Sequence, residues 1–181
     1  MKQFQTIYEE KTFQATVSEW KSQCASGPAF IHIFSDGADE SEITAACAII
    51  DEIMPDAAYI GSSASGCIYE GKVSTEKLVI SCTLFEKQDS FVTTQLFSLD
   101  DGDSSSFRTS LRECLSGLQG LKAIEVITTI DTIPIRDVCQ IIQEEVPENI
   151  PVWGGGAFGD NSFKGFLFKK GVPFCYAGVL M

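Results

Sequence analysis

Hydrophobic positions along the chain change their period in a regular order. Residues 29–34 form a nearly continuous run of apolar and β-branched side chains, which predicts a strand covered on both faces. Asp39 and Glu42 then have the spacing of a helix capping box, and apolar residues three or four apart mark one face of a helix that ends at Pro55. A second apolar run, 58–61, follows. This order of strand, helix and strand predicts a βαβ unit with parallel strands.

The segment before this unit predicts one strand and one helix. Residues 4–8 have the composition of a short strand. We expect the helix to begin near Thr16, because Thr16 and Glu19 have the spacing of another capping box. Val17 and Trp20 lie three residues apart and would belong to its buried stripe.

The middle of the chain predicts a loop and then a hairpin. Residues 62–75 are mostly small and polar, which favours a loop. The strand-like runs 78–85 and 91–99 are separated by the polar stretch 86–90, and this pattern is typical of two antiparallel strands.

The remaining residues repeat the pattern of the first half. They predict, in order, an acidic loop at 100–106, a helix over 107–118, a strand at 123–130, a helix at 134–146, a strand at 151–153, a glycine-rich loop, and a final hairpin of 165–170 and 172–180.

The recurrence is also visible in the residues themselves. A shift of 92 places aligns Cys47, Ile49, Ile50 and Pro55 with Cys139, Ile141, Ile142 and Pro147, and a shift of 93 aligns Gly61, Ala64 and Gly66 with Gly154, Ala157 and Gly159. We therefore predict an α/β fold in which two repeated βα-β-ββ units form mixed sheets with helices packed on them. The expected half-repeats are 29–99 and 121–181, within one domain spanning 1–181.

Composition and charge exclude several classes of function. The chain has 181 residues, 44% of them hydrophobic, and a formal charge of −12. Such an acidic chain repels phosphate backbones and anionic lipids, so we expect neither nucleic-acid nor membrane binding. The seven cysteines are odd in number and form no Cys-x-x-Cys pair, which favours free thiols in a reducing, cytoplasmic environment.

Two glycine-rich segments follow the predicted strands at equivalent places in the repeat. Ligands of open α/β sheets bind at the carboxyl ends of the strands, so both segments are candidates for one shared site. Backbone N–H groups and hydroxyls there would hold an anionic group, and Asp160 a cationic one. The candidate ligand-binding residues are Gly61, Ser62, Ser63, Gly66, Gly154, Gly155, Gly156 and Asp160. The alternative interpretation is that these small residues only allow tight packing.

The two glycine-rich segments also resemble a known family. The runs Ile60-Gly61-Ser62-Ser63-Ala64-Ser65-Gly66 and Trp153-Gly154-Gly155-Gly156-Ala157-Phe158-Gly159-Asp160 look like signatures of the amino-terminal part of the FIST sensory domain. The resemblance covers the chain from about Phe30 to its end. It implies a bacterial signalling module that binds a small molecule, for which amino acids have been proposed, without catalysis. It also implies an output partner of the diguanylate cyclase, kinase or chemoreceptor type.

Two features depart from that family pattern. Cys67 stands where members often carry an acidic residue, so a carboxylate contact there is not carried over. The family usually continues into a carboxyl-terminal FIST portion, whereas this chain stops at Met181, so we expect a fragment of a longer protein whose second portion is a partner. Some members bind haem, but His32 lies mid-strand and is the only histidine. We therefore predict no cofactor and no metal.

Two alternatives to a sensor remain open. Cys67 lies beside a glycine-rich segment whose backbone dipoles would favour a thiolate, so it is the candidate nucleophile of a cysteine-dependent enzyme. The other alternative is an interaction scaffold without a ligand. The main prediction is a sensory module that is not an enzyme and whose ligand is an amino acid or a small carboxylate.

Overall fold

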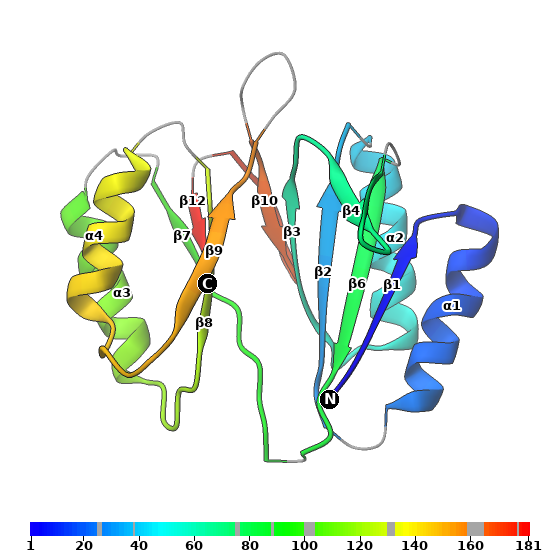
Figure 1. The fold of residues 1–181 in the computed structure, drawn as a ribbon, viewed down its shortest axis with the longest axis horizontal. Helices are drawn as coiled ribbons and strands as arrows, with labels where there is room; N and C mark the ends of the chain where they lie inside the picture. The colour runs from blue at the N-terminus through cyan, green and yellow to red at the C-terminus, as the bar shows by residue number, and fades with distance from the viewer. Residues whose placement is uncertain are drawn as a thin grey trace. The chain divides into compact units, whose positions relative to one another are not determined.

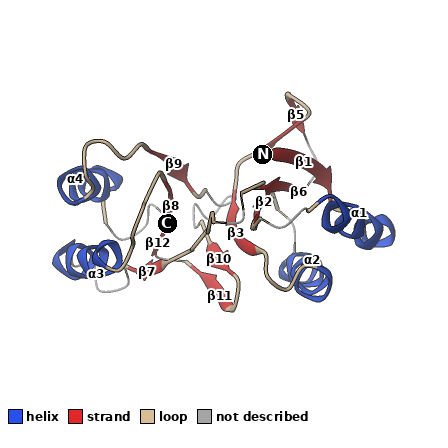
Figure 2. Cartoon of the chain, turned by 90° about the horizontal axis from the view of Figure 1, so that it is seen from below, coloured by secondary structure: helices blue, strands red, loops and turns tan. Residues whose placement is uncertain are grey.

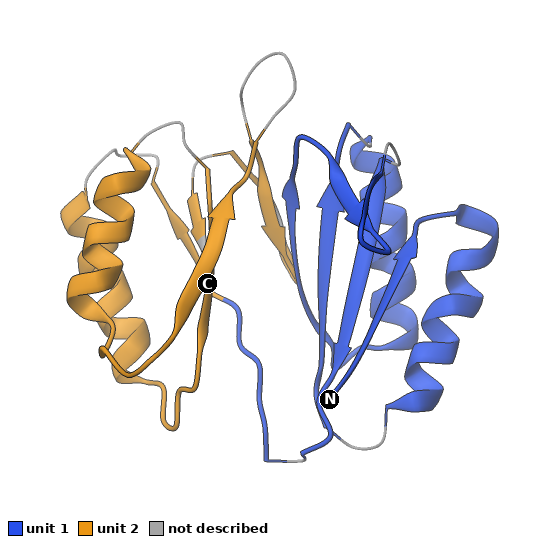
Figure 3. Cartoon of the chain, viewed as in Figure 1, with its two compact units in different colours: residues 1–94 blue, residues 95–181 orange. Residues whose placement is uncertain are grey.

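The chain forms two compact units, Met1–Thr94 and Gln95–Met181, which are coloured separately in Figure 3. The computed structural model describes every residue except 25–26, 38, 75–76, 88, 100–103, 130–132, 159–164 and 177.

Unit 1 has two helices on a sheet of four strands in the order β1-β6-β2-β3 (Figure 1). Strands β2 and β3 are parallel, while β6 is antiparallel to both β1 and β2. A small hairpin, β4–β5, follows β3. The elements are β1 (Lys2–Ile7), α1 (Glu10–Gln23), β2 (Ala29–Ser35), α2 (Glu40–Ile53), β3 (Ala58–Ser63), β4 (Cys67–Tyr69), β5 (Lys72–Ser74) and β6 (Leu78–Leu84).

Unit 2 has the same organisation, with four strands in the order β7-β12-β8-β9. Strands β8 and β9 are parallel, β12 is antiparallel to both β7 and β8, and the hairpin β10–β11 follows β9. The elements are β7 (Leu96–Ser98), α3 (Ser104–Ser116), β8 (Ile124–Thr128), α4 (Ile135–Glu145), β9 (Val152–Gly156), β10 (Leu167–Lys169), β11 (Val172–Cys175) and β12 (Gly178–Leu180).

The two units therefore repeat one element order and one sheet order. In each, the first strand and helix precede a strand–helix–strand crossover, a hairpin and a last strand that inserts between the first two. This confirms the predicted fold class of two repeated units with mixed sheets. The repeat extends further than the aligned residues indicated, because it begins with β1 and β7 rather than at positions 29 and 121.

Helices cover one face of each sheet, as Figure 2 shows for α1 and α2 and for α3 and α4. In unit 1, the predicted capping box is present: the Glu42 carboxylate accepts a hydrogen bond of 3.1 Å from the Asp39 N–H. Below it, Ile43, Ala46 and Ile50 are buried on one side of α2. The cap and the buried stripe together fix where this helix begins and which face it packs.

The core of unit 2 lies between its sheet and both helices. Its members are apolar and at most 8% exposed. They are Phe97, Leu99, Phe107, Leu111, Ile124, Val126, Ile133, Val138, Ile141, Ile142, Val146 and Val179.

Two predictions of local structure are wrong. Helix α1 begins at Glu10, not near Thr16, and the Thr16 hydroxyl donates back to the Thr12 carbonyl inside the helix. No hairpin joins 78–85 to 91–99, because β6 pairs with β1 and β2 while only Leu96–Ser98 of the later run is a strand, paired with β12. Pairing between distant segments decided both strands, and such pairing leaves no mark on local periodicity.

The other corrections concern the loop at 62–75 and the last strands. Ser62 and Ser63 complete β3, and β4 and β5 lie within the expected loop. The final hairpin is shorter than predicted, because residues 178–180 form the separate strand β12, which pairs with β7 and β8. No helix among the described residues is both long and apolar enough to cross a membrane.

Candidate functional site

The unit 1 candidates lie at the carboxyl end of β3 and are buried. Gly61, Ser62 and Ser63 are the last three residues of the strand, and the two serines are 4% and 5% exposed. Alternation places the serine side chains on opposite faces of the sheet. Ser63 faces the helices, as Tyr59 does, whose hydroxyl donates to the Asp51 carboxylate of α2 at 3.1 Å. The two hydroxyls therefore do not share one face.

The turn after β3 holds the other two unit 1 residues. Gly66 has a φ of +115°, a conformation that favours glycine. Cys67 begins β4 and is 4% exposed, with its thiol 3.7 Å from the Phe34 carbonyl oxygen. Burial, followed by the nearby charge of Asp36, raises the pKa of the Cys67 thiol. Burial therefore disfavours the thiolate that the alternative of a cysteine-dependent enzyme requires at Cys67.

The glycines of unit 2 form a strand rather than a loop. Gly154, Gly155 and Gly156 continue β9 beside Val126, Ile127 and Thr128 of β8. Gly154 has a φ of +152°, and a Cβ there would lie 1.7 Å from the Val126 carbonyl oxygen. A Cβ at Gly155 would meet no atom within 4 Å. The first glycine is thus required for pairing with β8, while the second leaves open space.

The register of β9 assigns its backbone groups to two edges. The Pro151 carbonyl accepts from the Ile124 N–H, and the Ala157 N–H donates to the Thr128 carbonyl. Because parallel strands use every second residue for one neighbour, residues 151, 153, 155 and 157 bond to β8. Val152, Gly154 and Gly156 consequently direct their N–H and C=O groups away from β8.

A groove of about 590 Å³ runs between β9 and α4. Gly154, Gly155 and Trp153 of β9 lie on one side of it, and Ile135 and Cys139 of α4 on the other. The remaining lining residues are Val126, Thr128, Val138, Ile142, Gln143, Val146, Pro147, Glu148, Ile150 and Val152. Since the glycines supply no side chains, the space between helix and strand stays open.

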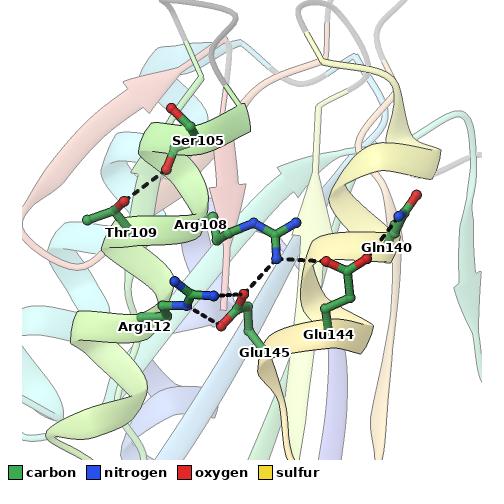
Figure 4. Close-up of polar contacts among 7 residues, drawn as sticks. All are labelled: Ser105, Arg108, Thr109, Arg112, Gln140, Glu144 and Glu145. Carbon is green, nitrogen blue, oxygen red and sulfur yellow. Dashed lines mark hydrogen bonds and ion pairs between the residues drawn. The ribbon is translucent and has the colours of Figure 1, made fainter.

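An ion-pair network holds α4 against α3 and so fixes one wall of this groove (Figure 4). The Glu145 carboxylate accepts from Arg108 at 2.6 Å and from Arg112 at 2.8 Å, while Arg108 also reaches Glu144 at 2.7 Å. Hydrogen bonds from Arg112 and Arg108 lower the pKa of Glu145, and those from Gln140 and Arg108 lower the pKa of Glu144.

The predicted site residues thus fall into three groups. Gly154 and Gly155 line the groove, and Gly156 ends the same strand. Gly61, Ser62, Ser63 and Gly66 belong to unit 1, and Asp160 lies outside the described residues. That the two glycine-rich segments share one site stays a prediction.

Sequence reasoning missed the α4 wall of the groove. Ile135 is 42% exposed and Trp153 is 53% exposed, although both are large and apolar. The signal was present in α4, whose apolar residues extend beyond the stripe that one buried face requires.

His32 lies on the face of β2 opposite the helices, in a row of aromatic side chains. Its ring centroid is 4.5 Å from that of Phe30 and 5.7 Å from that of Phe34. This agrees with the interpretation of a sheet-face imidazole packed among its neighbours.

Comparison with known proteins identifies the family. A family model described as the FIST N domain matches residues 29–180, most of the chain. The chain belongs to the FIST family. FIST is a family of sensory domains, so the resemblance of the glycine-rich segments is confirmed at the level of the family. No curated protein and no solved structure matches the chain.

Within this FIST domain, the match spans the crossover of each unit, from β2 through β12. Both glycine-rich segments therefore lie inside the family region, at the carboxyl ends of β3 and β9.

Proposed function

We propose that this FIST domain is a sensory module that binds a small molecule, an amino acid or a small carboxylate, in a cytoplasmic signalling protein, and catalyses no reaction. The observation that supports the proposal most directly is the groove beside β9. Gly155 lines it, and the space that a side chain would take there is empty. The raised pKa of the Cys67 thiol argues against the enzymatic alternative.

The unit 2 backbone supplies the donors that such a ligand needs. None of the described residues that line the groove is Lys or Arg, so a ligand carboxylate would be held by backbone N–H groups. Those of Gly154 and Gly156 point away from β8 and are suited to this role, whereas that of Gly155 is engaged by Val126. Asp160 remains our candidate for an ammonium group. Ligand binding would be signalled to an output partner and to a carboxyl-terminal FIST portion.

A thermal-shift screen of amino acids and small carboxylates tests the proposal. Ligand at about ten times its Kd adds about 1.4 kcal/mol, which raises the Tm of a chain of this size by about 3–6 °C. Gly155→Val adds bulk beside the backbone N–H groups of Gly154 and Gly156 that would hold the ligand, and it should abolish the shift. The matched control is Gly117→Val, whose added Cβ would make an ordinary contact of 3.6 Å after α3. No shift with any compound, or an unchanged shift in Gly155→Val, refutes the proposed site.

A further inference from the structure

β9 is an edge strand that stays exposed along its whole length. All five of its residues are exposed, although β3, at the same place in the repeat, is buried from Tyr59 to Ser63. An exposed edge offers a row of N–H and C=O groups to a further strand. Val152, Gly154 and Gly156 supply that row here, with no strand partner among the described residues. β9 is thus the last strand of its sheet, with an open edge among the described residues.

Helix α4 extends its apolar surface beyond the strands that it covers. Val138 and Ile142 are buried, whereas Ile135 and Cys139, one helical turn apart, are exposed and line the groove. A helix is about 10 Å wide and strands lie about 4.8 Å apart, so a helix covers about two strands. The exposed residues of α4 lie where the side chains of one more strand would reach.

We propose that β9 binds an extended segment of another polypeptide, which adds a fifth strand to the unit 2 sheet. The segment exchanges backbone hydrogen bonds with Val152, Gly154 and Gly156. Its alternate side chains enter the groove below Ile135 and Cys139. Backbone pairing gives such a complex its affinity, and the pocket for alternate side chains gives its specificity.

The charge of the groove defines the chemistry of the segment. Among the described residues that line the groove, Glu148 is the one with a carboxylate, and none is Lys or Arg. The whole chain carries a charge of −12. The segment therefore has apolar residues at alternate positions, a Lys or Arg near Glu148, and no acidic residue. The same charge disfavours a second copy of this chain, because pairing two acidic copies edge to edge brings like charges together.

This inference goes beyond small-molecule sensing and does not depend on it. A strand along β9 uses the whole edge, whereas the proposed small ligand uses the N–H groups near its carboxyl end. If both bind, they compete for Gly154 and Gly156. A small molecule that weakens strand binding would then link the sensor to its partner.

A displayed library of random nine-residue peptides, selected on the 181-residue chain, tests the proposal. Enriched peptides are synthesised with a fluorophore, and their Kd is measured by fluorescence polarisation. The first variant is Val152→Pro, which removes an N–H that β8 does not use and is tolerated at a strand edge. The second is Ile135→Glu, in the groove. The control is Val73→Glu, an exposed valine of the β4–β5 hairpin that is 85% exposed.

The expected result is enrichment of peptides with alternating apolar residues and a basic residue. Val152→Pro should weaken binding at least threefold and Ile135→Glu at least tenfold, while Val73→Glu changes it less than twofold. Bound peptide should also slow alkylation of Cys139 at least fivefold, since Cys139 is exposed while the other six cysteines are buried or partly buried. N-methylation of alternate peptide bonds in the bound peptide should abolish binding, because it removes the N–H donors along one edge of that peptide.

Several outcomes would overturn the strand site. They are the absence of enrichment, enriched peptides that lack the alternation or carry acidic residues, equal binding to all three variants, and an unchanged rate of Cys139 alkylation. Self-association of the chain that Val152→Pro abolishes would replace the peptide with a second copy. If an amino acid but no peptide protects Cys139 from alkylation, the proposed sensory function is retained and the proposed strand site is refuted.

Discussion

Adjacent glycines of β9 should respond in opposite ways to the same substitution. In Gly154→Ala, the new Cβ lies 1.7 Å from the Val126 carbonyl oxygen, at a φ of +152° that only glycine adopts readily. The backbone conformation costs about 1–3 kcal/mol. The displaced carbonyl also loses its bond from the Gly155 N–H, worth about 1 kcal/mol. The unfolding free energy of unit 2 should therefore fall by about 2–4 kcal/mol.

Gly155→Ala should leave the fold intact or stabilise it slightly. Its Cβ meets no atom within 4 Å, and its φ lies outside the left-handed region. Alanine also restricts the unfolded chain, which adds up to about 1 kcal/mol. The two variants should differ by about 3 kcal/mol, although they are neighbours in one strand.

Urea unfolding measures this difference. Far-UV circular dichroism follows both units, and in a Trp20→Phe background Trp153 is the single tryptophan and reports on β9. Equal unfolding free energies for the two variants would refute the assignment of Gly154 to strand pairing and of Gly155 to open space.

Three further predictions follow from other parts of the structure. Iodoacetamide at neutral pH should label Cys139 first and Cys67 far more slowly, because Cys139 is exposed while burial raises the pKa of Cys67. Peptide mass spectrometry measures both labelling rates, and equal rates would contradict the burial of Cys67. Tyr59→Phe should lower the unfolding free energy by about 1 kcal/mol, measured in urea, since it removes the hydrogen bond to Asp51; a neutral effect would argue against that bond. Arg112→Gln should lower the Tm at pH 7, and the Tm difference from the parent chain should shrink as the pH falls below about 4. The reason is that the pKa of Glu145 is lowered in the folded state, so the stabilisation by the ion pair is present above the unfolded pKa of Glu145 and is lost when Glu145 is protonated. A difference that stays constant with pH would exclude the ion pair as its source.

Local signals in the sequence predicted the crossover units well. The capping box at Asp39 and Glu42 and the apolar face of α2 are short-range features, and both appear in the structure. The strands at 29–34 and 58–61 were recognised because buried parallel strands are continuous apolar runs.

Features that depend on distant partners could not be read in the same way. The glycines of β9 look like a loop because glycine weakens a strand, and only their pairing with Val126 and Thr128 makes them one. Gly154 and Gly155 were correctly singled out, but the groove they line also needs α4 beside the strand. The alternative of a thiolate at Cys67 was drawn from its glycine neighbour, whereas burial beside Phe34 shifts the pKa of the thiol in the opposite direction.

Hydrogen exchange at individual amides of β9 tests the open edge most directly. The register of β9 predicts an alternating pattern. The amides of Trp153, Gly155 and Ala157, which bond to β8, should exchange at least about tenfold more slowly than those of Val152, Gly154 and Gly156, which point away from it. Equal protection of all six amides would mean that both edges of β9 are paired. Uniformly fast exchange would mean that the glycines form no strand, and either result would rule out an open strand edge at β9.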